Sequence, residues 1–302
     1  MADSRADAPE AAVARTTALV GLLLLALAAA ACAPGGEDSP RGATPGAQAD
    51  GDGSATGEPV HPAFTLDRQA LAALLDGTAS VVTTTVEADP RRFLELLDEV
   101  LDEPEDRTVL VDKTTDLGES YAPADLVELD TLADELALSR AGHRLTRDTA
   151  EALLEMNAAA ERDGITLVVS SAYRSYAYQA DLFARWVDEL GLEEAERVSA
   201  RPGTSQHQLG TTVDFGCICD EFASQPAGRW LAEHAWRYGF SLSYPEGYED
   251  LTGYSYEPWH FRYIGRSAAR LEREYFDGIQ QRMLEFLHAR HGDLEAARTH
   301  DR

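Results

Sequence analysis

RPGTSQHQLGTTVDFG (residues 201–216) and YEPWHFRYIG (residues 256–265) are the two stretches that decide the fold and chemistry of this chain. The first stretch holds His207 and Asp214, seven residues apart, and the second holds His260. Two imidazoles and one carboxylate make a three-ligand set that suits a catalytic zinc ion and leaves a fourth position open for water. The sequence therefore suggests a metal centre built from two distant segments.

A hydrolytic zinc site also needs a group that moves protons. Zinc lowers the pKa of water from about 16 to about 7, and a second carboxylate must then take the proton and pass it to the leaving amine. Glu257 is the candidate, because Pro258 and the bulky Trp259 hold it stiffly near His260. The spacing is not that of a strong zinc motif, and buried histidines that only pack in a core are the alternative.

A third stretch, SSAYRSYAYQ (residues 170–179), completes a wider pattern. Together the three stretches resemble the zinc D,D-carboxypeptidases of the VanY type, in the group that also includes L,D-carboxypeptidases, VanX-type dipeptidases and hedgehog-like domains. That group carries an S-x-H-x-x-G-x-x-x-D segment, found here from Ser205 to Asp214, and a later E-x-W-H segment, found here from Glu257 to His260. The resemblance covers about residues 109–266.

The resemblance implies a role for each matching residue. It implies one zinc ion per chain, bound by His207, Asp214 and His260. It also implies that Glu257 is the general base and then the general acid. Arg174 would stabilise the carbonyl oxygen as it becomes an oxyanion, a task that suits the fixed fork of a guanidinium.

Four further residues are implied to contact the substrate. Gln179 and Ser205 would help to seat it, through its terminal carboxylate. Tyr173 and Trp259 would line the cleft, although plain core packing explains Trp259 equally well.

Three features depart from the pattern of the resembled family. Gln206 stands where many relatives have Glu, and Ser243 stands where relatives often carry Arg, which removes a charge near the site. Cys217 and Cys219 are separated by one residue and do not form a CxxC pair. They either form a strained disulfide outside the cytoplasm or stay as two small buried thiols, and burial is the simpler expectation.

The implied activity is that of a D-alanyl-D-alanine carboxypeptidase, which removes the terminal D-Ala from the stem peptides of peptidoglycan. An L,D-carboxypeptidase that acts on tetrapeptide stems would share the zinc chemistry and is the alternative. A different class is a non-catalytic, zinc-bearing module that binds cell wall. Such modules keep the metal ligands and lose the base or the arginine, whereas Glu257 and Arg174 are both present here.

The N-terminal region predicts export. Residues 18–31 form an apolar run that is shorter than the roughly 20 residues of a membrane-spanning helix and fits a signal peptide. Small residues lead into Cys32, as in bacterial lipoprotein signals in which the cysteine is acylated. We therefore expect a signal over residues 1–32, a flexible linker over residues 33–62 and an extracytoplasmic protein tethered to the bacterial membrane. A plain secretory signal or an uncleaved anchor is the alternative.

Composition adds one exclusion and the expected architecture. The formal net charge of −27 argues against a nucleic-acid partner, because phosphate binding needs a basic face. We expect an α+β fold, with helices around a small antiparallel sheet in one zinc-peptidase domain over residues 106–292, preceded by a short accessory segment over residues 63–105. Helices are expected at residues 66–76, 90–103, 146–162, 176–190, 228–238 and 271–290, and strands at residues 80–86, 107–112 and 165–170.

Overall fold

The computed structural model describes residues 57–132 and 134–299. The predicted signal, Cys32 and most of the predicted linker lie outside these residues. Within the described part of the chain, no helix is long and apolar enough to cross a membrane.

Helices are the most abundant elements of the described chain. The α-helices are α1 (Arg68–Leu74), α2 (Ser80–Ala88), α3 (Pro90–Leu101), α4 (Arg147–Arg162), α5 (Tyr176–Leu190), α6 (Leu192–Val198), α7 (Pro226–His234), α8 (Glu249–Thr252), α9 (Arg266–Tyr275) and α10 (Gln280–Ala297). The strands are β1 (Leu126–Glu128), β2 (Ala137–Leu138), β3 (Arg144–Thr146), β4 (Val168–Ser171), β5 (Thr212–Phe215), β6 (Phe240–Leu242) and β7 (His260–Tyr263).

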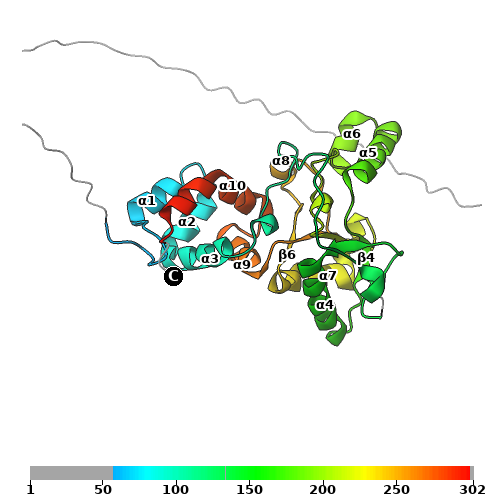
Figure 1. Ribbon diagram of the computed structural model, residues 1–302, viewed down its shortest axis with the longest axis horizontal. Helices are drawn as coiled ribbons and strands as arrows, with labels where there is room; N and C mark the ends of the chain where they lie inside the picture. Colours follow the sequence, from blue (N-terminus) through cyan, green and yellow to red (C-terminus); the bar gives the residue numbers. More distant parts are fainter. Residues whose placement is uncertain (1–56, 133, 300–302) are drawn as a thin grey trace, which may run out of the picture. The chain divides into compact units, whose positions relative to one another are not determined.

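A five-stranded sheet has the order β2-β4-β5-β7-β6. Helices α4 and α7 lie beside it (Figure 1). All neighbouring strands run antiparallel except β2 and β4, which are parallel. Strands β1 and β3 form a separate antiparallel pair. The α+β class expected from the sequence is confirmed, with one parallel pair at the edge of an otherwise antiparallel sheet.

One face of the sheet is apolar and buried. Val213 and Phe215 of β5 and Phe261 of β7 pack in a core with Met156 of α4 and Trp230 of α7. Because side chains alternate between the two faces of a strand, the residues between these apolar positions point the other way. That opposite face is where the site is built.

A second core joins helices from both ends of the described chain. Buried side chains of α1, α2 and α3 pack against those of α9 and α10 (Figure 1). The ring centroid of Phe93 lies 5.2 Å from that of Tyr275 and 6.0 Å from that of Phe286. Full burial of such a side chain contributes about 1.5–3 kcal/mol. The predicted accessory segment therefore shares its core with the C-terminal helices.

The prediction of a strand at residues 80–86 is wrong, because these residues belong to helix α2. Val82 and Val86, four residues apart, bury one face of that helix against the second core. The hydroxyl of Thr85 donates to the carbonyl oxygen of Val81 at 2.8 Å, which satisfies its polar group inside the helix. Tertiary packing thus overrides the β-branched composition of this segment.

The strand expected at residues 107–112 is also absent from the described structure. A short 3₁₀ turn covers Glu105–Arg107, and the residues after it do not join a sheet. Instead the fully buried guanidinium of Arg262 donates to the carbonyl oxygens of Arg107 (3.0 Å) and Val109 (2.8 Å). A side chain from β7 therefore supplies hydrogen bonds that a neighbouring strand would otherwise make.

The last helix is two helices rather than one over residues 271–290. Asp277 and Gly278 both have positive φ, 60° and 66°, a conformation that a right-handed helix cannot contain. The break ends α9 and lets α10 begin at Gln280 in a new direction. The helix expected at 228–238 is likewise α7 followed by a 3₁₀ turn over Ala235–Tyr238. The remaining helices and the strand at 165–170 are confirmed, with ends shifted by a few residues at most.

Candidate metal centre and active-site cleft

The register between β5 and β7 places two of the predicted ligands side by side. Asp214 and His260 are direct partners across the antiparallel pair. Directly opposed residues on one face of such a pair have Cβ atoms about 4.5–5.5 Å apart. Since their neighbours Val213 and Phe261 face the apolar core, Asp214 and His260 share the polar face of the sheet.

His207 reaches the same place from the turn that precedes β5. It lies in a 3₁₀ helix over Gln206–Leu209, which ends at Gly210. Gly210 has a φ of 72°, and a Cβ there would lie 2.9 Å from the side chain of Leu126. Only glycine fits this left-handed, crowded position, and the turn folds His207 back toward Asp214.

The donor atoms are close enough to share one ion. His207 Nε2 lies 3.2 Å from Asp214 Oδ2, and His260 Nδ1 lies 3.2 Å from Asp214 Oδ1. One ligand atom from each residue lies within 4.8 Å of the other two. Ligand atoms on a tetrahedral zinc ion with bonds of about 2.0–2.1 Å stand about 3.3 Å apart. The three donors therefore lie near enough to one another to close around one zinc ion.

Burial and missing partners support the same reading. His207, Asp214 and His260 are 0%, 5% and 3% exposed. Among the described residues, the buried atoms His207 Nε2 and Asp214 Oδ1 make no hydrogen bond of good geometry, and their polar contacts at 3.2 Å stay within the cluster itself. Buried polar atoms are ordinarily paired, so these atoms mark the position where a cation would complete the site.

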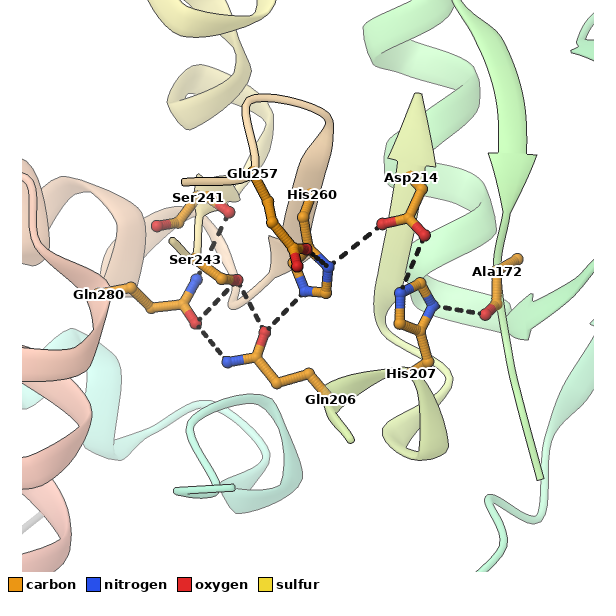
Figure 2. A network of polar contacts seen from close by, with 9 residues as sticks. All are labelled: Ala172, Gln206, His207, Asp214, Ser241, Ser243, Glu257, His260 and Gln280. Atoms are coloured by element: carbon orange, nitrogen blue, oxygen red, sulfur yellow. Dashed lines mark hydrogen bonds and ion pairs between the residues drawn. The ribbon is translucent and has the colours of Figure 1, made fainter. Parts of the chain in front are cut away.

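The second nitrogen of each histidine has an oxygen partner (Figure 2). His207 Nδ1 lies 2.7 Å from the carbonyl oxygen of Ala172, and His260 Nε2 lies 3.2 Å from Oε1 of Gln206. Metal-binding histidines commonly donate their other N–H to such oxygens, which orients the ring and fixes the tautomer. The partners thus leave His207 Nε2 and His260 Nδ1 as the ligand atoms.

Charges in the cluster favour a bound cation. Burial, with the positive charge of Arg174, lowers the pKa of His207 to about 4, so this ring is neutral at neutral pH. Burial raises the pKa of Asp214, but the adjacent His207 and His260 outweigh it and hold that pKa well below its usual value. Burial lowers the pKa of His260, but Asp214 and Glu257 outweigh burial and raise it to about 8. The two carboxylates therefore attract positive charge to this point.

Glu257 lies at the edge of the cluster. Its Oε2 is 3.3 Å from His260 Nδ1, and its side chain is 14% exposed. The backbone N–H of Glu257 donates to Tyr244 O (3.0 Å), and that of His260 donates to Glu257 O (3.1 Å), so a tight turn fixes the carboxylate beside the ligand. Burial raises the pKa of Glu257, as suits a group that must accept a proton.

The cluster opens into a cleft of about 280 Å³. Glu257, Arg174, Ser205 and Trp259 line it. The backbone N–H of Arg174 donates to His207 O at 3.2 Å, and its Nε is buried without a partner in the described chain. Trp259 also contacts the apolar core of the sheet. It therefore both lines the cleft and packs against the core.

Two predicted substrate residues lie elsewhere. Gln179 is fully buried, and its amide donates to Ala200 O (2.8 Å) and Ser199 Oγ (3.2 Å). Ser199 and Ala200 line the cleft, whereas Gln179 does not. Gln179 therefore holds this part of the wall from behind through its two hydrogen bonds. Tyr173 is not among the lining residues either, and its ring lies 5.1 Å from the guanidinium of Arg144. Direct substrate contact by Gln179 or Tyr173 stays a prediction.

Several lining residues escaped the sequence reasoning. Tyr178, Leu182 and Trp186 of α5 line the cleft, and their i, i+4, i+8 spacing is the signal that could have found them. Tyr244 and Tyr254 also line it, with ring centroids 4.7 Å apart. No spacing in the sequence marks these two tyrosines.

Cys217 and Cys219 form a disulfide, so the expectation of two buried thiols is wrong. The residue between them, Ile218, is 57% exposed and lines the cleft. The disulfide closes a short loop directly after β5 and the ligand Asp214. The loop closed by this disulfide therefore forms part of the edge of the cleft.

Fold and site together define a metallopeptidase-like protein, with three buried metal donors beside one cleft that Glu257 and Arg174 line. A family model described as VanY, D-alanyl-D-alanine carboxypeptidase, matches residues 142–266. YodJ of Bacillus subtilis, a protein named as a carboxypeptidase, is 34% identical over 198 residues, which are 61% of this chain and 71% of YodJ. The chain belongs to the VanY-type D-alanyl-D-alanine carboxypeptidase family.

Further relatives agree with this placement. A D-alanyl-D-alanine carboxypeptidase of Enterococcus faecium is 31% identical, and the match spans 57% of this chain but only 58% of that protein. The solved structure of the LD-carboxypeptidase LdcB has a TM-score of 0.53 and 34% identity, covering 58% of this chain and 84% of LdcB. The solved structure of VanYB in complex with D-alanine-D-alanine has a TM-score of 0.50 and 31% identity. The match covers 60% of this chain and 97% of VanYB.

The ligand assignment predicts the zinc content of purified protein. Wild type should hold one zinc ion per chain, and His207→Ala should hold almost none, because two remaining donors cannot complete the site. His234→Ala is the matched control, since His234 is half-buried at the end of α7 and is not among the residues that line the cleft. Elemental analysis after dialysis measures the ratio. Equal zinc content in wild type and His207→Ala would contradict the assignment.

Proposed function

We propose that this chain is a zinc-dependent D-alanyl-D-alanine carboxypeptidase that removes the terminal D-Ala from peptidoglycan stem peptides. The observation that supports this most directly is the convergence of three buried metal donors with Glu257 beside one cleft. A module that only binds zinc would not need a buried carboxylate next to the ligand. Membership of the family adds the substrate class.

His207, Asp214 and His260 would hold the zinc ion, which would supply the Lewis acidity that makes water a nucleophile at neutral pH. Glu257 takes the proton from that water as its oxygen attacks the carbonyl carbon of the scissile peptide bond. The same carboxyl group then delivers the proton to the leaving amine as the C–N bond breaks. Its raised pKa suits it to hold the proton between the two steps.

Arg174 stabilises the charge that develops during this attack. Its side chain lines the cleft, and its Nε is a buried donor without a partner in the described chain. Such a donor costs stability in the free protein and becomes useful when an oxyanion forms beside it. The backbone hydrogen bond from Arg174 to the ligand residue His207 holds this segment beside the metal donors, and the positive charge of Arg174 helps to lower the pKa of His207.

The lining of the cleft fits a short peptide end. Aromatic and aliphatic side chains of Tyr178, Leu182 and Trp186 provide an apolar wall, and Ser205 adds a hydroxyl. Ile218 extends the wall toward solvent. A volume of about 280 Å³ accommodates the last residues of a stem and leaves the rest outside. An L,D-carboxypeptidase acting on tetrapeptide stems would use the same catalytic groups and is the alternative.

The mechanism predicts that Glu257→Gln binds zinc and releases no D-Ala. The amide has nearly the same shape as the carboxylate, so the fold should survive, but it cannot accept the proton of water. A positioned acid–base group contributes about 10²–10⁴-fold to the rate. Arg174→Ala should lower kcat by about 10²–10³-fold through loss of an oxyanion donor. Release of D-Ala from a pentapeptide stem measures both.

Glu246→Gln is the matched control, because Glu246 is an exposed carboxylate outside the lining of the cleft. It should keep the wild-type rate. If Glu257→Gln retains zinc and still releases D-Ala at that rate, Glu257 is only a structural carboxylate and the mechanism is wrong.

We also propose that the mature protein begins at an acylated Cys32 and is tethered outside the cytoplasm. The support is the apolar run at residues 18–31, the small residues before Cys32 and the Gly- and Pro-rich stretch after it. A single acyl chain binds membranes only marginally, so stable anchoring needs more than one.

This proposal predicts that Cys32→Ser leaves the membrane fraction, because the acylation site is lost. Membrane fractionation of cells that produce the full chain measures the effect, with Cys217→Ser as a control that removes a different cysteine. If Cys32→Ser stays membrane-bound and uncleaved, an N-terminal signal anchor holds the protein instead.

A further inference from the structure

The two histidine ligands need their tautomers fixed, and the structure does this in two different ways. In a neutral imidazole one nitrogen carries a proton and the other offers a lone pair to the metal. His207 Nδ1 faces the backbone carbonyl of Ala172 at 2.7 Å, and a carbonyl can only accept. The proton of His207 must therefore sit on Nδ1, which leaves Nε2 for the metal.

The hydrogen-bond partner of His260 is an amide, which can either donate or accept. Its Nε2 lies 3.2 Å from Oε1 of Gln206. An amide carries an acceptor at one end and donors at the other. If Gln206 turned over, its NH₂ group would face His260 and favour the tautomer with the proton on Nδ1. The correct tautomer of His260 therefore requires that Gln206 be held in one orientation.

Gln280, the first residue of α10, supplies that orientation (Figure 2). Gln206 Nε2 donates to Gln280 Oε1 at 3.2 Å, and Gln280 Nε2 donates to the backbone carbonyl of Ser241 in a longer contact of 3.4 Å. Because the carbonyl of Ser241 accepts only, it sets the direction of Gln280. Gln280 in turn sets the direction of Gln206.

Burial and a serine reinforce the chain of contacts. Gln206, Gln280 and Ser243 are 2%, 1% and 2% exposed, so water is not available to pair a reversed amide. The hydroxyl of Ser243 donates to Gln206 Oε1 at 2.7 Å. A reversed Gln206 would place its NH₂ against His260 and leave its carbonyl facing Gln280 Oε1, acceptor against acceptor.

We propose that Gln280 is a positioning residue for the metal centre, acting through Gln206 to hold His260 with its Nδ1 lone pair toward the ion. The proposal rests on the metal site of the proposed function. It gives the helical core a part in the chemistry, because α10 packs in that core with α1, α2 and α3. Gln280 lies outside the sequence stretches that hold the ligands.

Zinc affinity of the full chain, measured by competition with a chromophoric chelator, tests the proposal. Gln280→Met keeps the length of the side chain and removes both polar ends. Its zinc dissociation constant should rise about 10–100-fold, the usual effect of losing a partner behind a metal ligand. Gln281→Met is the matched control, since Gln281 is also buried at the start of α10 but bonds to Asp112 and Glu285 instead. It should change zinc affinity by less than about threefold.

A second background separates orientation from general support. In Gln206→Glu the carboxylate accepts from His260 with either oxygen, so nothing is left for Gln280 to orient. The step from Gln280 to Met should therefore cost less than about threefold in the Gln206→Glu background, against about 10–100-fold with Gln206 present. Equal losses in both backgrounds would overturn the proposal, because they indicate a purely structural role.

The outcomes distinguish this proposal from the function itself. If wild type binds no zinc, the metal site of the proposed function fails. If wild type binds zinc and Gln280→Met binds it equally tightly, only the role of Gln280 is wrong. Should Gln280→Met not fold, as judged by thermal unfolding, Gln280→Ser carries the same expectation with a smaller side chain, and an unchanged zinc affinity there overturns the proposal.

Discussion

The pairing of β5 with β7 in a single register is the constraint on which the site depends. It makes Asp214 and His260 direct neighbours on the polar face of the sheet, while Val213 and Phe261 anchor the opposite face in the core. A slip of one residue would exchange the two faces and bury the ligands among apolar side chains. The same strand register thus buries those apolar side chains and positions the metal donors.

Much of the site could be predicted, because its chemistry requires particular residue types in particular motifs. The convergence of His207 with Asp214 and His260 follows the motifs. The helix over Ser80–Ala88 could not be read from local pattern, since contacts from α9 and α10, far away in sequence, decide it. The proposed role of Gln280 could not be predicted from the sequence either. It depends on the break after Gly278, which lets α10 begin at Gln280 in a new direction.

Behind the ligand His260, the side chains that make the supporting hydrogen bonds are neutral. At these two positions the resemblance implies Glu in place of Gln206 and Arg in place of Ser243. Here the two contact each other directly, with Ser243 Oγ 2.7 Å from Gln206 Oε1. A buried pair of neutral groups avoids the cost of burying two charges, but it loses the single polarity of a carboxylate. The need for Gln280 to orient the amide follows from that difference.

The central claim, a zinc-dependent D-alanyl-D-alanine carboxypeptidase, is tested most directly by product analysis with defined stems. Zinc-loaded protein is incubated with pentapeptide and tetrapeptide stems, and mass spectrometry identifies the residue that leaves. We predict that the pentapeptide loses its terminal D-Ala while the tetrapeptide stays intact, and that chelation of zinc stops the reaction. Loss of the last residue from the tetrapeptide alone would identify an L,D-carboxypeptidase, and no release from either stem would contradict the account.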